Sequence, residues 1–155
     1  MLNDKFNKYE CLFKYFNKKA KVYFSYSITA NGRGIGSNTH FIAAVPFPQK
    51  KHTDEDCFFI TLHEFTHQFT DCLINSNISM NNNTHALSEN IVIFADYYLL
   101  KMIDETKIDM YFNWICKISG HEGEQLDEKT FLKIFTLSDE NNSMLLFLLN
   151  NIIIA

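Results

Sequence analysis

The chain lacks most of the features that would place it in a specialised class of protein. Its 155 residues include five glycines and two prolines, and no repeat or low-complexity tract interrupts them. The four cysteines, Cys11, Cys57, Cys72 and Cys116, have no CxxC spacing and lie among apolar or aromatic neighbours. We therefore expect reduced, buried thiols instead of a disulfide framework, in one globular domain covering residues 1–155.

A surplus of basic charge is also missing. Lysine and arginine together number 14 against 18 aspartates and glutamates, which leaves a net charge of −4. Because a protein that neutralises phosphates needs a basic face, this balance argues against nucleic acid as the main partner. The 46% hydrophobic and 15% aromatic content is instead typical of a soluble globular protein.

No segment has the pattern of a secretory leader or a membrane anchor. The first five residues hold no apolar run, and the apolar stretch from Met144 to Ala155 is interrupted by Asn150 and Asn151. That stretch is too short to span a bilayer, which takes about 20 apolar residues. We expect a cytoplasmic protein with no membrane partner, unless the chain is a fragment of a longer protein.

Apolar periodicity predicts a helix and two strands in the first third of the chain. Apolar residues three and four apart predict an amphipathic helix over residues 3–19. Alternation and β-branched or aromatic content predict strands over 21–29 and 41–47, joined by a loop or wide hairpin turn at 31–38. The prolines in and after the second strand place it at the edge of the sheet.

The remainder of the chain is predicted to be helical. Thr53 is a suitable N-cap with Asp56 three positions on, so a central helix starts there and runs to about Ile74. A polar, asparagine-rich linker follows over 75–84. Further helices are expected over 86–104, 108–118, 128–136 and 142–153. The order of one helix, a hairpin and then helices indicates the α+β class.

The glycine-rich loop at 31–38 does not have a nucleotide-binding pattern. It reads NGRGIGSN, without the Gly-Lys-Ser/Thr ending of a phosphate-binding loop. A strand rather than a helix is predicted after it, so no helix N-terminus is available to bind an anion.

The central helix carries the most informative pattern, the HExxH run from His63 to His67. Two histidines four apart lie on one face of a helix, and their imidazoles can converge on one metal ion. Glu64 projects beside the same site, where it can take a proton from a metal-bound water. The pattern predicts a zinc site of the hydrolytic kind.

A third protein ligand is expected downstream, because catalytic zinc sites usually have three. Glu89 is the preferred candidate, since it lies at the start of the next predicted helix and runs into an apolar segment. A carboxylate is costly to bury there unless it is paired, and a metal ion would pair it. His85 is the rival ligand, although its polar surroundings equally suit an exposed loop residue.

Two aspartates could support the ligands from behind. Asp96 lies seven residues after Glu89, on the same helical face, and could accept the free N–H of a zinc-bound histidine. Asp71 lies four residues after His67 and could orient a histidine or serve as an ordinary polar residue. The sequence does not decide between these two roles of Asp71.

The segment from His63 to Asp71, HEFTHQFTD, resembles the HELTHxxTD segment of thermolysin-like peptidases. An HExxH helix followed by a glutamate ligand on the next helix is the arrangement of the gluzincin metallopeptidases. The stretch Glu89–Tyr97 is similar to the corresponding helix of gluzincin aminopeptidases. The resemblance covers residues 53–100.

The resemblance implies a zincin-like fold and a defined set of roles. The fold would combine an N-terminal helix, a small sheet with an edge strand, the active-site helix, the glutamate helix and a C-terminal helical cap. One Zn²⁺ per chain would be bound by His63, His67 and Glu89, with Glu64 as general base.

The chain departs from this family in two respects. It is much shorter than these enzymes and has no Gly-x-Met-Glu-Asn segment on the predicted edge strand, so aminopeptidase specificity is not implied. The second catalytic group of the family cannot be placed by its sequence pattern. Tyr97, Tyr98 and His121 are candidates for stabilising the transition state, although the tyrosines also suit a core and His121 an exposed loop.

The sequence therefore predicts a zinc metallopeptidase that acts on a peptide or protein substrate. One alternative is an intracellular regulatory zincin that cleaves a single partner, like the small HExxH proteins found beside mobile-element repressors. Those proteins have a similar size and a similar apolar helix, here Phe94-Ala95 and Leu99-Leu100, in a register displaced by one residue. The other alternative is a non-enzymatic, metal-bound binding domain of a larger protein, against which the intact Glu64 argues.

Overall fold

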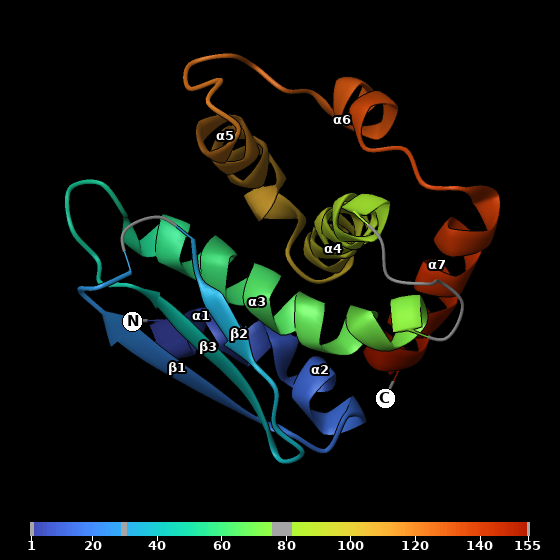
Figure 1. Cartoon of the computed structure of the whole chain (residues 1–155), viewed down its shortest axis with the longest axis horizontal. Coiled ribbons are helices and arrows are strands. Elements are labelled where there is room, and N and C mark those ends of the chain that lie inside the picture. The colour runs from blue at the N-terminus through green and yellow to red at the C-terminus, as the bar shows by residue number, and fades with distance from the viewer. Residues whose placement is uncertain (1, 29–30, 76–81, 155) are drawn as a thin grey trace.

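The computed structural model describes residues 2–28, 31–75 and 82–154. A small sheet lies on one side of a long central helix, α3 (Asp54–Asn75) (Figure 1). On the other side of α3 lie α4 (Asn82–Ile103) and α5 (Ile108–Ile118). The chain thus has the predicted mixed α+β fold.

The N-terminal helical segment packs its phenylalanines against α3 and the sheet. It consists of α1 (Leu2–Phe6), a 3₁₀ turn (Asn7–Tyr9) and α2 (Glu10–Tyr15), and is therefore shorter than the predicted helix over 3–19. Asn17 takes a left-handed conformation (φ 49°), which asparagine tolerates after a helix end and which turns the chain into the first strand.

The sheet has three strands in the order β1-β3-β2. β1 (Lys19–Ser25) runs parallel to β3 (His40–Pro46), and the short β2 (Arg33–Ile35) pairs antiparallel with β3. The predicted hairpin between the two long strands is therefore wrong, because part of the glycine-rich loop forms β2 and reverses the chain once more.

The prediction that the strand over 41–47 lies at the edge of the sheet is also wrong. β3 is the central strand, with Phe41, Ala43 and Val45 buried on the face toward α3. Pro46 lies at the last position of β3, where its missing N–H interrupts no ladder beyond it. β2 is the edge strand that lies against Glu64 of the HExxH turn.

The start of α3 has the predicted capping box. The Asp56 N–H donates to Thr53 Oγ1 over 3.1 Å, and the Thr53 N–H donates to Asp56 Oδ2 over 2.7 Å. Lys117 of α5 donates to the same Asp56 oxygen over 2.7 Å, which ties the two helices together.

Further along α3, Gln68 joins the helix to the sheet. Its amide nitrogen donates to the carbonyls of Ile42 and Glu64, each over 2.9 Å. Its amide oxygen accepts the Ile42 N–H over 3.1 Å. The side chain therefore contacts the central strand as another backbone would, and fixes the height of the HExxH turn above β3.

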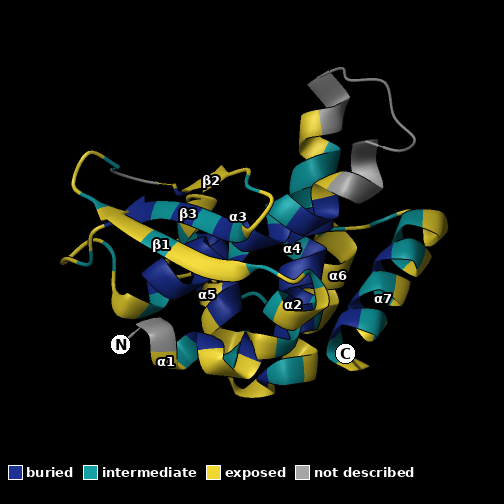
Figure 2. Cartoon of the chain, turned by 90° about the horizontal axis from the view of Figure 1, so that it is seen from below, coloured by how far each residue is buried: buried dark blue, intermediate teal, exposed yellow. Residues whose placement is uncertain are grey.

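The C-terminal elements cover α4 and close the core. They are α6 (Glu128–Ile134) and α7 (Asp139–Ile154), close to their predicted ranges. A 3₁₀ turn (Glu105–Lys107), which was not predicted, precedes α5. α4 begins at Asn82, four residues before the predicted start, so the predicted linker is shorter; residues 76–81 lie outside the described residues. Figure 2 shows the buried core between the sheet and the helices and the exposed outer face of β1.

Two further expectations concern thiols and membranes. Cys11, Cys57 and Cys116 are free, and the side chain of Cys72 lies outside the described residues. Within the part of the chain that the structure describes, no helix combines the length and apolarity that a bilayer crossing requires.

Candidate metal centre

The middle of α3 directs two imidazoles to one point, as the HExxH spacing predicts. The Nε2 atoms of His63 and His67 are 3.2 Å apart, and both side chains are half-buried. Phe65 and Phe69, which face the opposite way, are fully buried against the aromatic residues of α1, α2 and β3. Core packing of one helix face thus presents the histidine face to α4.

α4 brings Glu89 to the same point. Glu89 Oε2 is 3.3 Å from His63 Nε2, and Glu89 Oε1 is 3.4 Å from His67 Nε2. An ion bound tetrahedrally at about 2.0–2.1 Å from each ligand requires ligand atoms about 3.3 Å apart. The three measured separations match this value, and among the described residues this is the one group of histidine, cysteine and acidic side chains with metal-binding spacing.

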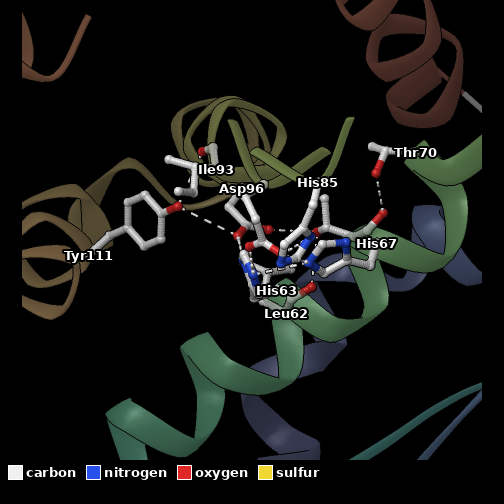
Figure 3. Close-up of polar contacts among 10 residues, drawn as sticks. Leu62, His63, His67, Thr70, His85, Ile93, Asp96 and Tyr111 are labelled. Atoms are coloured by element: carbon white, nitrogen blue, oxygen red, sulfur yellow. Dashed lines mark hydrogen bonds and ion pairs between the residues drawn. The ribbon is translucent and has the colours of Figure 1, made fainter. Parts of the chain in front are cut away.

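Asp96 holds His63 from behind. The carboxylate is fully buried, and its Oδ2 is 2.9 Å from His63 Nδ1, as Figure 3 shows. The Nδ1–H therefore donates to Asp96, which leaves the Nε2 lone pair directed at the Glu89 side of the cavity. The role predicted for Asp96, accepting the free N–H of a metal-binding histidine, has the required geometry.

Two buried hydroxyl groups in turn surround Asp96. Thr66 Oγ1 is 2.6 Å from Asp96 Oδ1, and the hydroxyl of Tyr111, reaching from α5, is 3.5 Å from Asp96 Oδ2 (Figure 3). Tyr111 is fully buried and also donates to the carbonyl of Ile93 over 3.1 Å. These contacts give both oxygens of a fully buried carboxylate hydrogen-bond partners.

The electrostatic state of the ligands follows from these contacts. Burial alone would lower the pKa of His63, but hydrogen bonds and charge attraction from Asp96 and Glu89 raise this pKa to about 10. Hydrogen bonds from His63 and His67 hold the pKa of Glu89 well below its usual range. The acidic groups around His63 thus favour a positive charge at this position.

Glu64 lies next to this group, between α3 and the edge strand. Burial raises the pKa of its carboxyl, against the opposing charges of His63 and His67 and a hydrogen bond from the Gly34 N–H. A raised carboxyl pKa suits a group that accepts and returns a proton near neutral pH.

The glycines of the loop allow β2 to approach Glu64 closely. A Cβ on Gly32 would lie 2.7 Å from Glu64 Cγ and 2.7 Å from Ile60 Cγ2. A Cβ on Gly34 would lie 3.2 Å from Glu64 Oε2. By contrast, Gly36 has open space around it. The glycine-rich pattern is explained at two of its positions by this contact rather than by a phosphate.

A cavity of about 310 Å³ opens over the ligands. Its lining comes from β2 and the residues before it, from α3, and from α4 and α5. Trp114 of α5 lies edge-on to His63, with ring centroids 6.1 Å apart. The described residues that line the cavity are Asn31, Gly32, Arg33, Gly34, Ile60, His63, Glu64, His67, His85, Glu89, Ile93, Trp114 and Ile118.

The rival ligand and the second supporting aspartate lie at the periphery. His85 is on the cavity rim, exposed, with its Nδ1 3.7 Å from Glu89 Oε1, and so lies outside the closest ligand group. Asp71 is exposed and does not line the cavity. Burial raises the pKa of its carboxyl, while the charge of His67 lowers it.

The structure does not bring the three predicted transition-state residues to the cavity. The hydroxyl of Tyr97 bonds to Glu128 and Lys101, and the ring of Tyr98 packs at a tilt against the rings of Phe94 and Tyr97. His121 is exposed and bonds to Glu124 over 2.9 Å. None of the three is among the described residues that line the cavity.

Several site residues escaped the sequence analysis. Thr66 could have been found, because it lies three residues after His63 and therefore on the same helical face. The three glycines within residues 31–38 indicated a close backbone contact, but not that Gly32 and Gly34 make it with Glu64. No sequence signal indicated the role of Tyr111, because its position in the sequence does not reveal that it contacts Asp96.

The donor set fits zinc better than most ions. Two imidazole nitrogens and one carboxylate oxygen, with a carboxylate behind the first histidine, are the ligand types of catalytic zinc sites with one position left for water. Calcium and magnesium, by comparison, prefer oxygen ligands. The chain matches no protein-family model, no curated protein and no solved structure.

Proposed function

We propose that this chain is a zinc-dependent metallopeptidase with a zincin-like arrangement of strand, HExxH helix and glutamate helix. The observation that supports it most is the ligand geometry: separations of 3.2, 3.3 and 3.4 Å between His63, His67 and Glu89 fit one tetrahedrally bound ion. Glu64 beside them supplies the base that a pure binding site has no need of.

Zinc, when bound, would polarise the scissile carbonyl and lower the pKa of a bound water to about 7. Glu64 would be the general base, holding a proton at its carboxylate and returning it to the leaving amine. Asp96 keeps His63 in the tautomer that presents Nε2 to the ion. The Gly34 N–H holds the Glu64 carboxylate toward β2, beside the ligand group and outside it.

The peptide would lie along β2. This strand ends the sheet, so its outer edge is unpaired among the described residues, and it forms one wall of the cavity. An extended peptide can add to such an edge through main-chain hydrogen bonds. This replaces the sequence-based expectation that the strand over 41–47 provides the edge.

The group that stabilises the transition state would come from the cavity wall. Asn31 and His85 line the cavity and carry side-chain hydrogen-bond donors, whereas Tyr97, Tyr98 and His121 do not line it. A donor must lie within about 3 Å of the developing oxyanion to act on it. We therefore assign transition-state stabilisation to the donors that line the cavity, in place of the three residues predicted from the sequence.

Metal content tests the site. Wild-type protein purified without chelating resins should bind about one zinc per chain, and Glu89→Ala should lose it or bind it far more weakly. Glu122→Ala, which removes an exposed acid outside the cavity, is the matched control. Zinc retained by Glu89→Ala would move the third ligand to His85, and absence of zinc from the wild type after reconstitution would overturn the proposal.

Activity tests the base. Glu64→Gln keeps the size of the side chain and should remain folded and loaded with zinc, yet hydrolyse casein or a peptide mixture at least about a thousandfold more slowly than wild type. A zinc-loaded wild type without activity on any protein would instead favour a metal-bound binding domain.

A further inference from the structure

Arg33 occupies a distinctive place on the edge strand. It is the only arginine of the chain and is the first of the three residues of β2. Its backbone neighbours are Gly32 and Gly34, both packed against α3, so Arg33 offers the one side chain of this short run. Arg33 also lines the cavity over the metal-binding residues.

The pleat of the strand places the Arg33 side chain on the outer face of the sheet. Successive side chains alternate between faces, and Gly34 faces α3. On the outer face, the neighbour of Arg33 across the ladder is Ala44 of β3. A methyl group cannot bond to a guanidinium, so one side of Arg33 is apolar and its other side is the free edge of β2.

The charge of Arg33 is not used within the described structure. Lys5, Lys8, Lys101, Lys107 and Lys117 all form ion pairs with acidic side chains. No ion pair between described residues involves Arg33, and its side chain is exposed. Glu64 is contacted by Gly32 and Gly34, on the opposite face of β2 from the Arg33 side chain.

A peptide added to the edge of β2 would fill the free side of Arg33. Residues directly opposite each other on paired strands have Cβ atoms about 4.5–5.5 Å apart and share a face of the sheet. The peptide residue opposite Arg33 would therefore project beside the guanidinium. Arginine binds a carboxylate through two parallel hydrogen bonds, which a neutral amide cannot match.

We propose that Arg33 selects peptide substrates with an acidic side chain at the position that pairs with it on β2. The inference rests on the proposed peptidase function and adds a substrate class to it. In this proposal Arg33 is the specificity-determining residue of β2. It lies between Gly32 and Gly34, which allow the strand to approach Glu64 closely.

Binding to an inactive protein tests the inference. Zinc-loaded Glu64→Gln would be mixed with fluorescein-labelled pools of short extended peptides, identical except for one fixed Glu, Gln or Lys in each register. Anisotropy should show the Glu pool binding about tenfold more tightly than the Gln pool. Arg33→Ala should abolish this preference, Arg33→Glu should reverse it toward the Lys pool, and Lys133→Ala, an exposed cation on α6, should leave it unchanged.

The outcomes separate this inference from the proposed function. Equal binding of the Glu and Gln pools, or a Glu preference that survives Arg33→Ala, would overturn the inference, while cleavage of those peptides by the zinc-loaded wild type would leave the peptidase standing. Zinc-loaded protein that neither binds nor cleaves any pool would overturn both. Zinc content and circular dichroism of each Arg33 variant confirm that the fold and the metal site are intact.

Discussion

At the scale of single residues, the site depends on groups that never touch the metal position. Asp96 accepts the His63 Nδ1–H, and the hydroxyls of Thr66 and Tyr111 surround that carboxylate in the core. Each of these groups is fully buried. A change in any of them would act on the site through the orientation of His63, because none of them belongs to the ligand group itself.

Asp96→Asn should weaken zinc binding about 10–100-fold, because an amide accepts the Nδ1–H less strongly and cannot balance the charge of a metal-bound histidine. Competition with a chromophoric zinc chelator measures the affinity. Asp71→Asn is the matched control, since Asp71 is exposed and off the cavity. Equal affinities of the two variants would remove Asp96 from the site.

Gly32→Ala should destabilise the fold by about 1–3 kcal/mol, because the new methyl group would meet Ile60 and Glu64 at 2.7 Å and push β2 away from α3. Gly36→Ala, with no atom within 4 Å of its added methyl, should cost nothing measurable. Urea denaturation of both variants gives the comparison. A loss at Gly36 equal to that at Gly32 would contradict the packing argument.

At the scale of elements, local patterns predicted the helices better than the sheet. The capping box at Thr53 and Asp56 located the start of α3, and periodicity gave α5 its observed bounds. Alternation indicates that a strand exists but carries no information about its partner or direction. The parallel pairing of β1 with β3 was therefore missed, and β2 is too short and glycine-rich to alternate visibly.

The N-terminus of α3 should carry a pH-dependent contribution to stability. Burial raises the pKa of Asp56, but hydrogen bonds from Lys117 and Thr53 outweigh it and lower this pKa overall. The contribution is therefore fully present above the unfolded-state pKa of about 3.9 and is lost as the pH falls through the lower folded pKa.

Asp56→Asn, which keeps a capping oxygen, should cost about 1 kcal/mol at neutral pH and progressively less below about pH 4. Urea denaturation of wild type and variant over this pH range tests it, with Asp54→Asn, an exposed acid of the same turn, as the control. A cost at neutral pH that persisted unchanged in acid would contradict the assignment to charge.

At the scale of the whole molecule, the candidate site joins two long helices that otherwise meet through their cores. α3 contributes His63 and His67, and α4 contributes Glu89. His63 and His67 could be predicted because they lie four residues apart on one helix. Glu89 followed from the need for a third ligand, whereas the cavity wall from β2 and the reach of Tyr111 from α5 depend on tertiary packing.

Under the proposed function, zinc should stabilise the entire fold, because an ion held by His63, His67 and Glu89 would bind the packed α3–α4 pair and not the separated helices. The gain is about 2.7 kcal/mol when free zinc exceeds its dissociation constant about a hundredfold. Thermal denaturation with zinc and with a chelator measures it. His67→Ala should abolish the shift and His121→Ala, an exposed histidine, should retain it; a shift that survives His67→Ala would place the ion elsewhere.

Different interactions hold the two halves of α3 in place, and this difference determines which half separates from its neighbours first. Ionic contacts from Lys5, Lys107 and Lys117 hold the first turn, whereas the neutral amide of Gln68 holds the histidine-bearing half to the central strand. Acid or concentrated salt weakens only the first kind of contact. Under such stress, amide protons of α5 would exchange before those of β3, and the helix turn that carries His63 and His67 would be among the last parts to leave the sheet.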